Sequence, residues 1–276
     1  MARRLLQPLC LALATLVWAC GPALADQPLG RYQDARLLIA TARCYTPAQK
    51  VKLEEELART LAAKVSPVTL AQLTQMALMR AVPAEHLSGF YQALRRVRAV
   101  DGLPEGPFAA KMAEGLAKGA PAELILQVVL ERERHYLQAR QLMMSNVRHQ
   151  ALYDRGYYRV MDLTAEALRR GLPAQGLARI FQVRNSSLEE MGRAVGAYLY
   201  MQAIGFPPDV APDILVAALE AGEFQECRAC LSQVIFSAKR AGAPPRKVRD
   251  DLVRGLRSGH DLGELARVLY AVPGNQ

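Results

Sequence analysis

The chain has 276 residues, of which 51% are apolar, 22% charged and 6% aromatic, and its formal net charge is +9. This composition excludes a disordered chain, which would hold fewer apolar residues, and the low numbers of Gly, Pro and Cys exclude collagen-like and disulfide-dense proteins. Ala and Leu outnumber the β-branched residues, which favours helix over sheet. We therefore expect an all-α protein that is long enough to bury a core.

The first 25 residues have the order of a secretory signal peptide. Arg3 and Arg4 give a positive start, residues 9–19 are apolar except for Thr15, and residues 23–25 read Ala-Leu-Ala, a small-residue cleavage signal. We expect cleavage before Asp26 and export to the periplasm or the cell exterior. No later stretch reaches the roughly 18 apolar residues of a membrane helix, so we expect no transmembrane span in the mature chain.

An alternative for the leader is a lipid anchor on Cys20, because residues 17–20, Val-Trp-Ala-Cys, loosely resemble the lipobox of bacterial lipoproteins. The bulky Trp18 departs from that pattern, and a soluble exported protein is the main prediction. Cleavage before Asp26 would lower the formal charge to +7, since two arginines and no acids leave. It would also leave an odd set of three thiols, so in an oxidising compartment at least one stays free or pairs between molecules.

Helix start signals are frequent in the mature chain. A Ser, Thr or Asp that precedes a Pro, or stands three residues before a Gln or Glu, predicts helix starts at Thr46, Ser66, Ser187 and Asp261. Apolar residues at helical spacing predict buried helix faces, which include Leu188, Met191, Val195, Tyr198 and Leu199 in one helix and Val160, Leu163, Ala167 and Leu168 in another.

Helix ends share a Gly-x-Pro triplet at residues 102–104, 119–121, 171–173, 205–207 and 242–244, with a variant at 81–83 in which Ala replaces Gly. Gly accepts the left-handed conformation that ends a helix, and Pro suits the start of the next helix because no N–H is needed there. The triplets therefore predict tight corners between antiparallel helical hairpins.

The corners are quasi-regular, since Gly171 and Gly205 are 34 residues apart and Gly205 and Gly242 are 37 apart. Such a period indicates a solenoid-like helical repeat, with an irregular helical bundle as the alternative. The tetratricopeptide and ankyrin sequence patterns are missing, so we assign no family.

The regular spacing of the corners is interrupted between Pro121 and Arg155, where no Gly or Pro occurs. This stretch predicts either one long helix or two helices with a joint near Ser145–Asn146. It also marks a place for a subdivision near residue 150. We predict a single all-helical domain over residues 26–276.

Cys227 and Cys230 form a Cys-x-x-Cys motif, a spacing that suits thiol–disulfide exchange or half of a zinc site. The residues before it indicate a helix already under way, and no second cysteine pair exists for zinc, so structural cysteines are the main interpretation. A structural disulfide that involves Cys44 is the second, and it would require the chain to close on itself. A redox or metal function is the third.

Residues 153–159 gather three tyrosines and two arginines at a predicted corner: Tyr153, Arg155, Tyr157, Tyr158 and Arg159. Such a set can stack on a sugar ring or bind an acidic group. The alternative is that the rings pack on the core. The mixed run 131–134 is interpreted as a solvated helix face. The sequence predicts no catalytic residue, metal site or cofactor.

The function expected from these patterns is that of an exported, non-enzymatic helical-repeat protein whose groove binds a protein or peptide. One alternative is an envelope-associated structural protein that binds anionic surface polymers through its arginines. The other is a thiol oxidoreductase that uses Cys227 and Cys230. Export argues against nucleic acid as the partner.

Overall fold

The computed structural model describes residues 32–100, 103–147, 156–225 and 230–270, and over these ranges the chain forms thirteen helices and no strand. The prediction of an all-α protein is therefore confirmed. The leader at 1–25, Tyr153, Arg155 and Cys227 lie outside the described residues. None of the helices in the described ranges is both long and apolar enough to cross a membrane.

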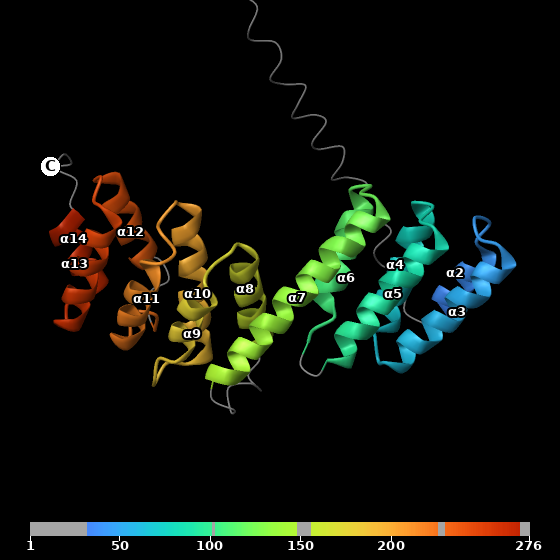
Figure 1. Ribbon diagram of the computed structural model, residues 1–276, viewed down its shortest axis with the longest axis horizontal. Coiled ribbons are helices and arrows are strands. Elements are labelled where there is room, and N and C mark those ends of the chain that lie inside the picture. The colour runs from blue at the N-terminus through green and yellow to red at the C-terminus, as the bar shows by residue number, and fades with distance from the viewer. Residues whose placement is uncertain (1–31, 101–102, 148–155, 226–229, 271–276) are drawn as a thin grey trace, which may run out of the picture.

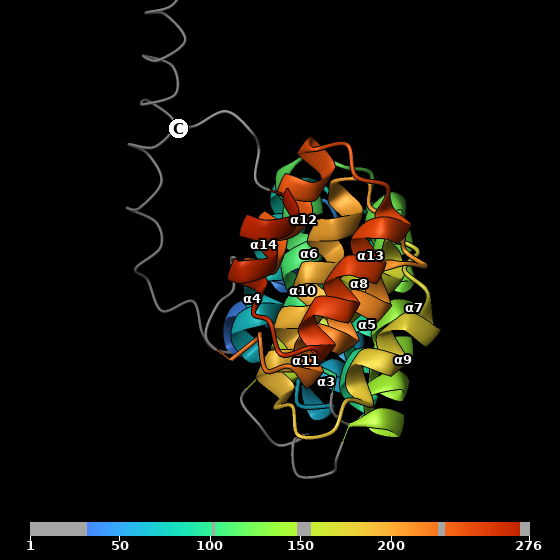
Figure 2. The same ribbon diagram turned by 90° about the vertical axis from the view of Figure 1, so that its left-hand side faces the viewer.

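The helices follow one another along the long axis of an elongated stack and form two layers (Figure 1). The first layer holds α2 (Tyr32–Thr41), α4 (Pro67–Met79), α6 (Gly106–Ala117), α8 (Tyr157–Arg169), α10 (Leu188–Ala203), α12 (Cys230–Arg240) and α14 (Leu262–Tyr270). The second layer holds α3 (Pro47–Ala62), α5 (Ala84–Ala99), α7 (Ala122–Asn146), α9 (Ala174–Phe181), α11 (Ala211–Glu220) and α13 (Pro245–Arg257). Seen along the long axis, the helices lie behind one another (Figure 2).

A continuous apolar core runs between the layers from Ala35 to Leu265. It includes most of the predicted helix faces, since Leu188, Met191, Val195 and Tyr198 are all buried. The predicted starts are confirmed as well: Thr46 and Ser187 form capping boxes, and Ser66 accepts a hydrogen bond from the Thr69 N–H. Asp261 likewise accepts from the Glu264 N–H at 2.7 Å.

The predicted corners at 81–83, 119–121, 171–173, 205–207 and 242–244 are present, and Gly102 of the triplet at 102–104 lies outside the described residues. The glycines at 119, 171, 205 and 242 have φ between 70° and 78°, and Ala81 adopts the same region at φ 50°. In each corner the middle residue donates its N–H to a carbonyl five residues earlier, as Leu172 does to Ala167 at 3.0 Å. At four of these corners the next helix begins at once, with the prolines at 83, 121, 173 and 244 at its N-cap. Pro207 does not start a helix as predicted, because α11 begins at Ala211 with Val210 as its N-cap.

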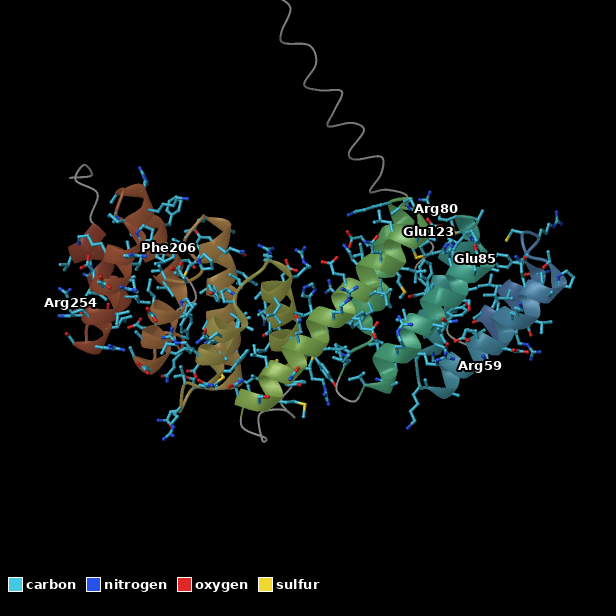
Figure 3. All side chains as sticks on the ribbon, in the orientation of Figure 1. Arg59, Arg80, Glu85, Glu123, Phe206 and Arg254 are labelled. Atoms are coloured by element: carbon cyan, nitrogen blue, oxygen red, sulfur yellow. The ribbon has the colours of Figure 1, made fainter. Side chains whose placement is uncertain are left out.

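These corners all lead from the first layer to the second, so they lie along one edge of the stack, the upper edge in Figure 1. A side chain near one corner bonds the end of the neighbouring helix. The guanidinium of Arg80, labelled in Figure 3, donates to the Ala117 carbonyl at 2.7 Å, and the Gln202 amide donates to the Arg170 carbonyl at 2.8 Å. Lys239 donates to the Ile204 carbonyl in the same way. Carbonyls without intrahelical partners at helix ends are thereby satisfied.

The stack changes its packing at α7, a helix of 25 residues that crosses it obliquely (Figure 1). The helix ends at Asn146, where the sequence predicts a joint between two helices. Here α8 packs against α7 and α10 rather than against α6. The prediction that residues 131–134 form a solvated helix face is wrong for two of them. Arg132 lies over the Tyr136 ring, and its guanidinium is 3.6 Å from the Asp162 carboxylate. The Glu133 side chain is only 13% exposed and pairs with Arg96. Partial burial raises the pKa of Asp162, and the charge of Arg132 opposes this shift.

Candidate functional site

A groove of about 510 Å³ opens on the first layer where α8, α10 and the start of α12 meet. We call it the α8–α10–α12 groove. Its lining consists of Gly156, Arg159, Val160 and Leu163 from α8 and its N-cap, of Glu189, Gly192, Arg193, Gly196, Ala197 and Tyr200 from α10, and of Phe224 and Ser232. The lining residues of α8 and α10 recur at intervals of three and four, so each helix turns one continuous face to the groove.

Two glycines four residues apart on α10 shape the floor of the groove. A β-carbon added at Gly192 would lie 2.7 Å from Cγ2 of Val160, so the absence of a side chain lets α8 and α10 approach closely. At Gly196, one turn later, an added β-carbon would meet no atom of the described ranges within 4 Å. The helices thus touch at Gly192 and leave open space at Gly196.

Arg193 fixes one wall of the groove. Its guanidinium donates to the carbonyl of Phe224 and, at 3.2 Å, to that of Gln225, and it pairs with Glu189 at 2.7 Å. The chain between α11 and α12 is thereby bonded to α10, which holds the buried Phe224 against the groove. Arg193 therefore positions the wall and is already engaged by its own chain.

Among the described lining residues, Arg159 is a cation that is available to a ligand. Arg159 is exposed and, within the described ranges, has no ion-pair partner. Tyr200 is 37% exposed on α10, and Phe236, 49% exposed, lies one turn along α12 from Ser232. The arrangement offers apolar and aromatic surface beside an exposed guanidinium, a combination that is common in binding sites.

The predicted tyrosine and arginine set is divided by the structure. Tyr157 is buried with its ring 5.7 Å from that of Tyr158, and Tyr158 is exposed outside the groove lining. Arg159 is the member of this set that the structure brings to the groove. Tyr153 and Arg155 lie outside the described residues, so their part in binding stays a prediction.

The predicted cysteine sites are only partly described. Cys44 is an exposed free thiol between α2 and α3, and Cys230 is the first residue of α12. The α2–α3 hairpin and α12 lie at opposite ends of the stack (Figure 1), so a bridge between them within one chain would need the closed shape that the stack lacks. A redox role for Cys227 and Cys230 stays a prediction. Over the described ranges, no group of three His, Cys, Asp or Glu side chains is placed to hold a metal ion.

Sequence reasoning missed Gly192, Arg193 and Gly196. The available signal was the pair of glycines inside a helix predicted over residues 188–199, because Gly weakens a helix interior and its presence there calls for a packing reason. Comparison with known proteins adds no further residues: no protein-family model, no curated protein and no solved structure matches this chain.

Proposed function

We propose that this chain is an exported, non-enzymatic helical-repeat protein that binds a protein or peptide partner in the α8–α10–α12 groove. Export is inferred from the leader at residues 1–25. The groove runs across three neighbouring first-layer helices, as expected for a surface that receives an extended segment.

One observation carries this proposal: the open space over Gly196. An interior helical position normally gains from a side chain, and no atom of the described residues would obstruct one at residue 196. With Val160, Leu163 and Ala197 around it, the space suits an apolar side chain of a partner. Arg159 at the rim would meet a carboxylate or carbonyl of the same segment.

The test fills the groove without disturbing the fold. Tagged protein is purified from the envelope of the source cells with its bound partners, and the partners are identified by mass spectrometry. The variant Gly196→Trp places a large side chain in the open space. Its control is Gln72→Trp, on the exposed side of α4 in the same layer.

The proposal predicts that a partner recovered with the parent is lost from Gly196→Trp and kept by Gln72→Trp, while both variants melt like the parent. A partner that Gly196→Trp retains at parental yield would contradict the groove as the binding site.

A further inference from the structure

A second groove, of about 630 Å³, lies on the other layer, between α11 and α13 with one residue from α9. We call it the α11–α13 groove. Its lining holds four arginines and two aspartates around two valines: Arg179, Asp213, Val216, Arg249, Asp250, Val253, Arg254, Arg257 and Ser258. It shares no residue with the α8–α10–α12 groove.

The acids of this groove are engaged at one end. Asp213 pairs with Arg179 at 2.7 Å and with Arg249 at 3.6 Å, and Asp250 pairs with Arg249 at 2.7 Å. Asp250 also holds the pKa of the Arg249 guanidinium above its ordinary value. These pairs neutralise Arg179 and Arg249 and fix them across α9, α11 and α13.

The other end of the groove keeps its positive charge. Arg254 and Arg257 are exposed and have no acidic partner in the part of the chain that the structure describes. They stand three residues apart on α13, so their β-carbons are about 5–6 Å apart on one side of the helix. Figure 3 shows Arg254 at the C-terminal end of the stack. Two neighbouring guanidinium groups repel each other until a ligand supplies the anions.

The remaining lining selects among anionic ligands. Val216 and Val253 are half-buried and form an apolar floor between the charged ends. Because Asp213 and Asp250 compensate Arg179 and Arg249, the remaining positive charge is confined to Arg254 and Arg257, which suits a ligand with a few carboxylates better than a densely charged polyanion. Among the described lining residues there is no aromatic ring on which a sugar could stack. A peptide with carboxylates beside an apolar side chain matches both the valines and the two unpaired arginines.

We propose that the α11–α13 groove is a second docking site, which binds an acidic peptide segment of a partner protein through Arg254 and Arg257. The site is independent of the proposed function of the α8–α10–α12 groove. Guanidinium groups bind carboxylates through paired N–H donors, which suits the side chains of Glu and Asp.

The test uses the full mature chain and a fluorescent peptide of alternating Glu and Val, with a Gln and Val peptide as the uncharged probe. Binding is measured by fluorescence anisotropy at low salt. The variant is Arg254→Glu with Arg257→Glu. Its matched control is Arg240→Glu with Arg246→Glu, which makes the same change in net charge at two exposed arginines outside the groove lining.

The proposal predicts that the acidic peptide binds and the Gln peptide does not, and that Arg254→Glu with Arg257→Glu weakens binding at least about tenfold. The control pair should weaken it less than about threefold, since only long-range attraction is lost. A third variant, Ser258→Glu, adds a competing carboxylate in the groove and should also weaken binding.

Equal losses in the two double variants would overturn the proposal, because they would show attraction to net charge alone. So would binding of vesicles of anionic lipid, or of a sulfated polysaccharide, that requires Arg254 and Arg257 while the acidic peptide fails to bind. All variants are checked for parental melting by circular dichroism.

Discussion

Gly192 on α10 lies against Val160 on α8 so closely that a β-carbon at residue 192 would come within 2.7 Å of Cγ2 of Val160. Val160 is buried and β-branched, and its χ1 angle has little freedom inside a helix. The contact therefore fixes the distance between two first-layer helices, and with it the width of the α8–α10–α12 groove.

Substitution of Ala at Gly192 and at Gly196 should change stability in opposite directions. Gly192→Ala forces α8 and α10 apart and should destabilise by about 1–3 kcal/mol, the usual cost of overpacking. Gly196→Ala meets no atom within 4 Å in the part of the chain that the structure describes, and it should stabilise by about 0.5–1 kcal/mol, because Ala favours helix. Urea denaturation measures both. Equal shifts of the same sign would contradict the described contact.

The Gly-x-Pro corners depend on the backbone of the glycine. Gly171 has φ 78°, and an added β-carbon there would meet nothing within 4 Å, so any cost of substitution comes from the backbone alone. Gly171→Val should destabilise by about 1–2 kcal/mol, and Gly171→Asn by less, because Asn tolerates the left-handed region. Thermal melting compares the three proteins. A valine variant that melts like the parent would show that the corner has another geometry.

The stability of the fold should fall at alkaline pH as Tyr198 ionises. Its buried hydroxyl donates to the Pro208 carbonyl at 2.5 Å, and burial, with the charge of Asp209 adding, raises its pKa to about 12. Because an unfolded Tyr has a pKa of about 10, the stabilising effect of the neutral phenol is complete below about pH 10 and is lost as the pH rises toward about 12.

The measurement for Tyr198 is the difference in near-ultraviolet absorbance between the parent and Tyr198→Phe during an alkaline titration. The native difference signal should titrate near pH 12, and in urea near pH 10. Native titration near pH 10 would show that the hydroxyl is open to solvent.

The leader makes a prediction that needs no variant. Mass spectrometry of the protein recovered from the exporting cell should show a mature chain that begins at Asp26. A chain that begins at Cys20 with added acyl mass, or one that incorporates labelled palmitate, would instead support the lipid anchor.

The corners could be predicted from sequence because their causes are local. A glycine that accepts positive φ and a proline that lacks an N–H act within three residues, and even the Ala81 variant adopts the left-handed geometry. Capping at Thr46 and Ser187 is similarly local. The end of α7 at Asn146 coincides with the predicted joint.

The grooves could not be predicted, because they depend on which faces of distant helices meet. The mixed charges of residues 131–134 are typical of a solvated helix face, yet Arg132 pairs with Asp162 because α8 packs on α7. Arg254 and Arg257 look like their paired neighbours in the sequence, and only the positions of Asp213 and Asp250 show which arginines are already neutralised. Which arginines are paired therefore depends on contacts between residues that are far apart in the sequence.

The most direct test of the proposed binding groove is photo-cross-linking inside the exporting cell. p-Benzoylphenylalanine replaces Tyr200, an exposed aromatic residue of the groove lining, in one protein and Gln72 in another, and adducts are identified after irradiation. We predict that the partner lost by Gly196→Trp is captured from residue 200 and not from residue 72. Capture of that partner from residue 72 but not from residue 200 would contradict binding in the α8–α10–α12 groove.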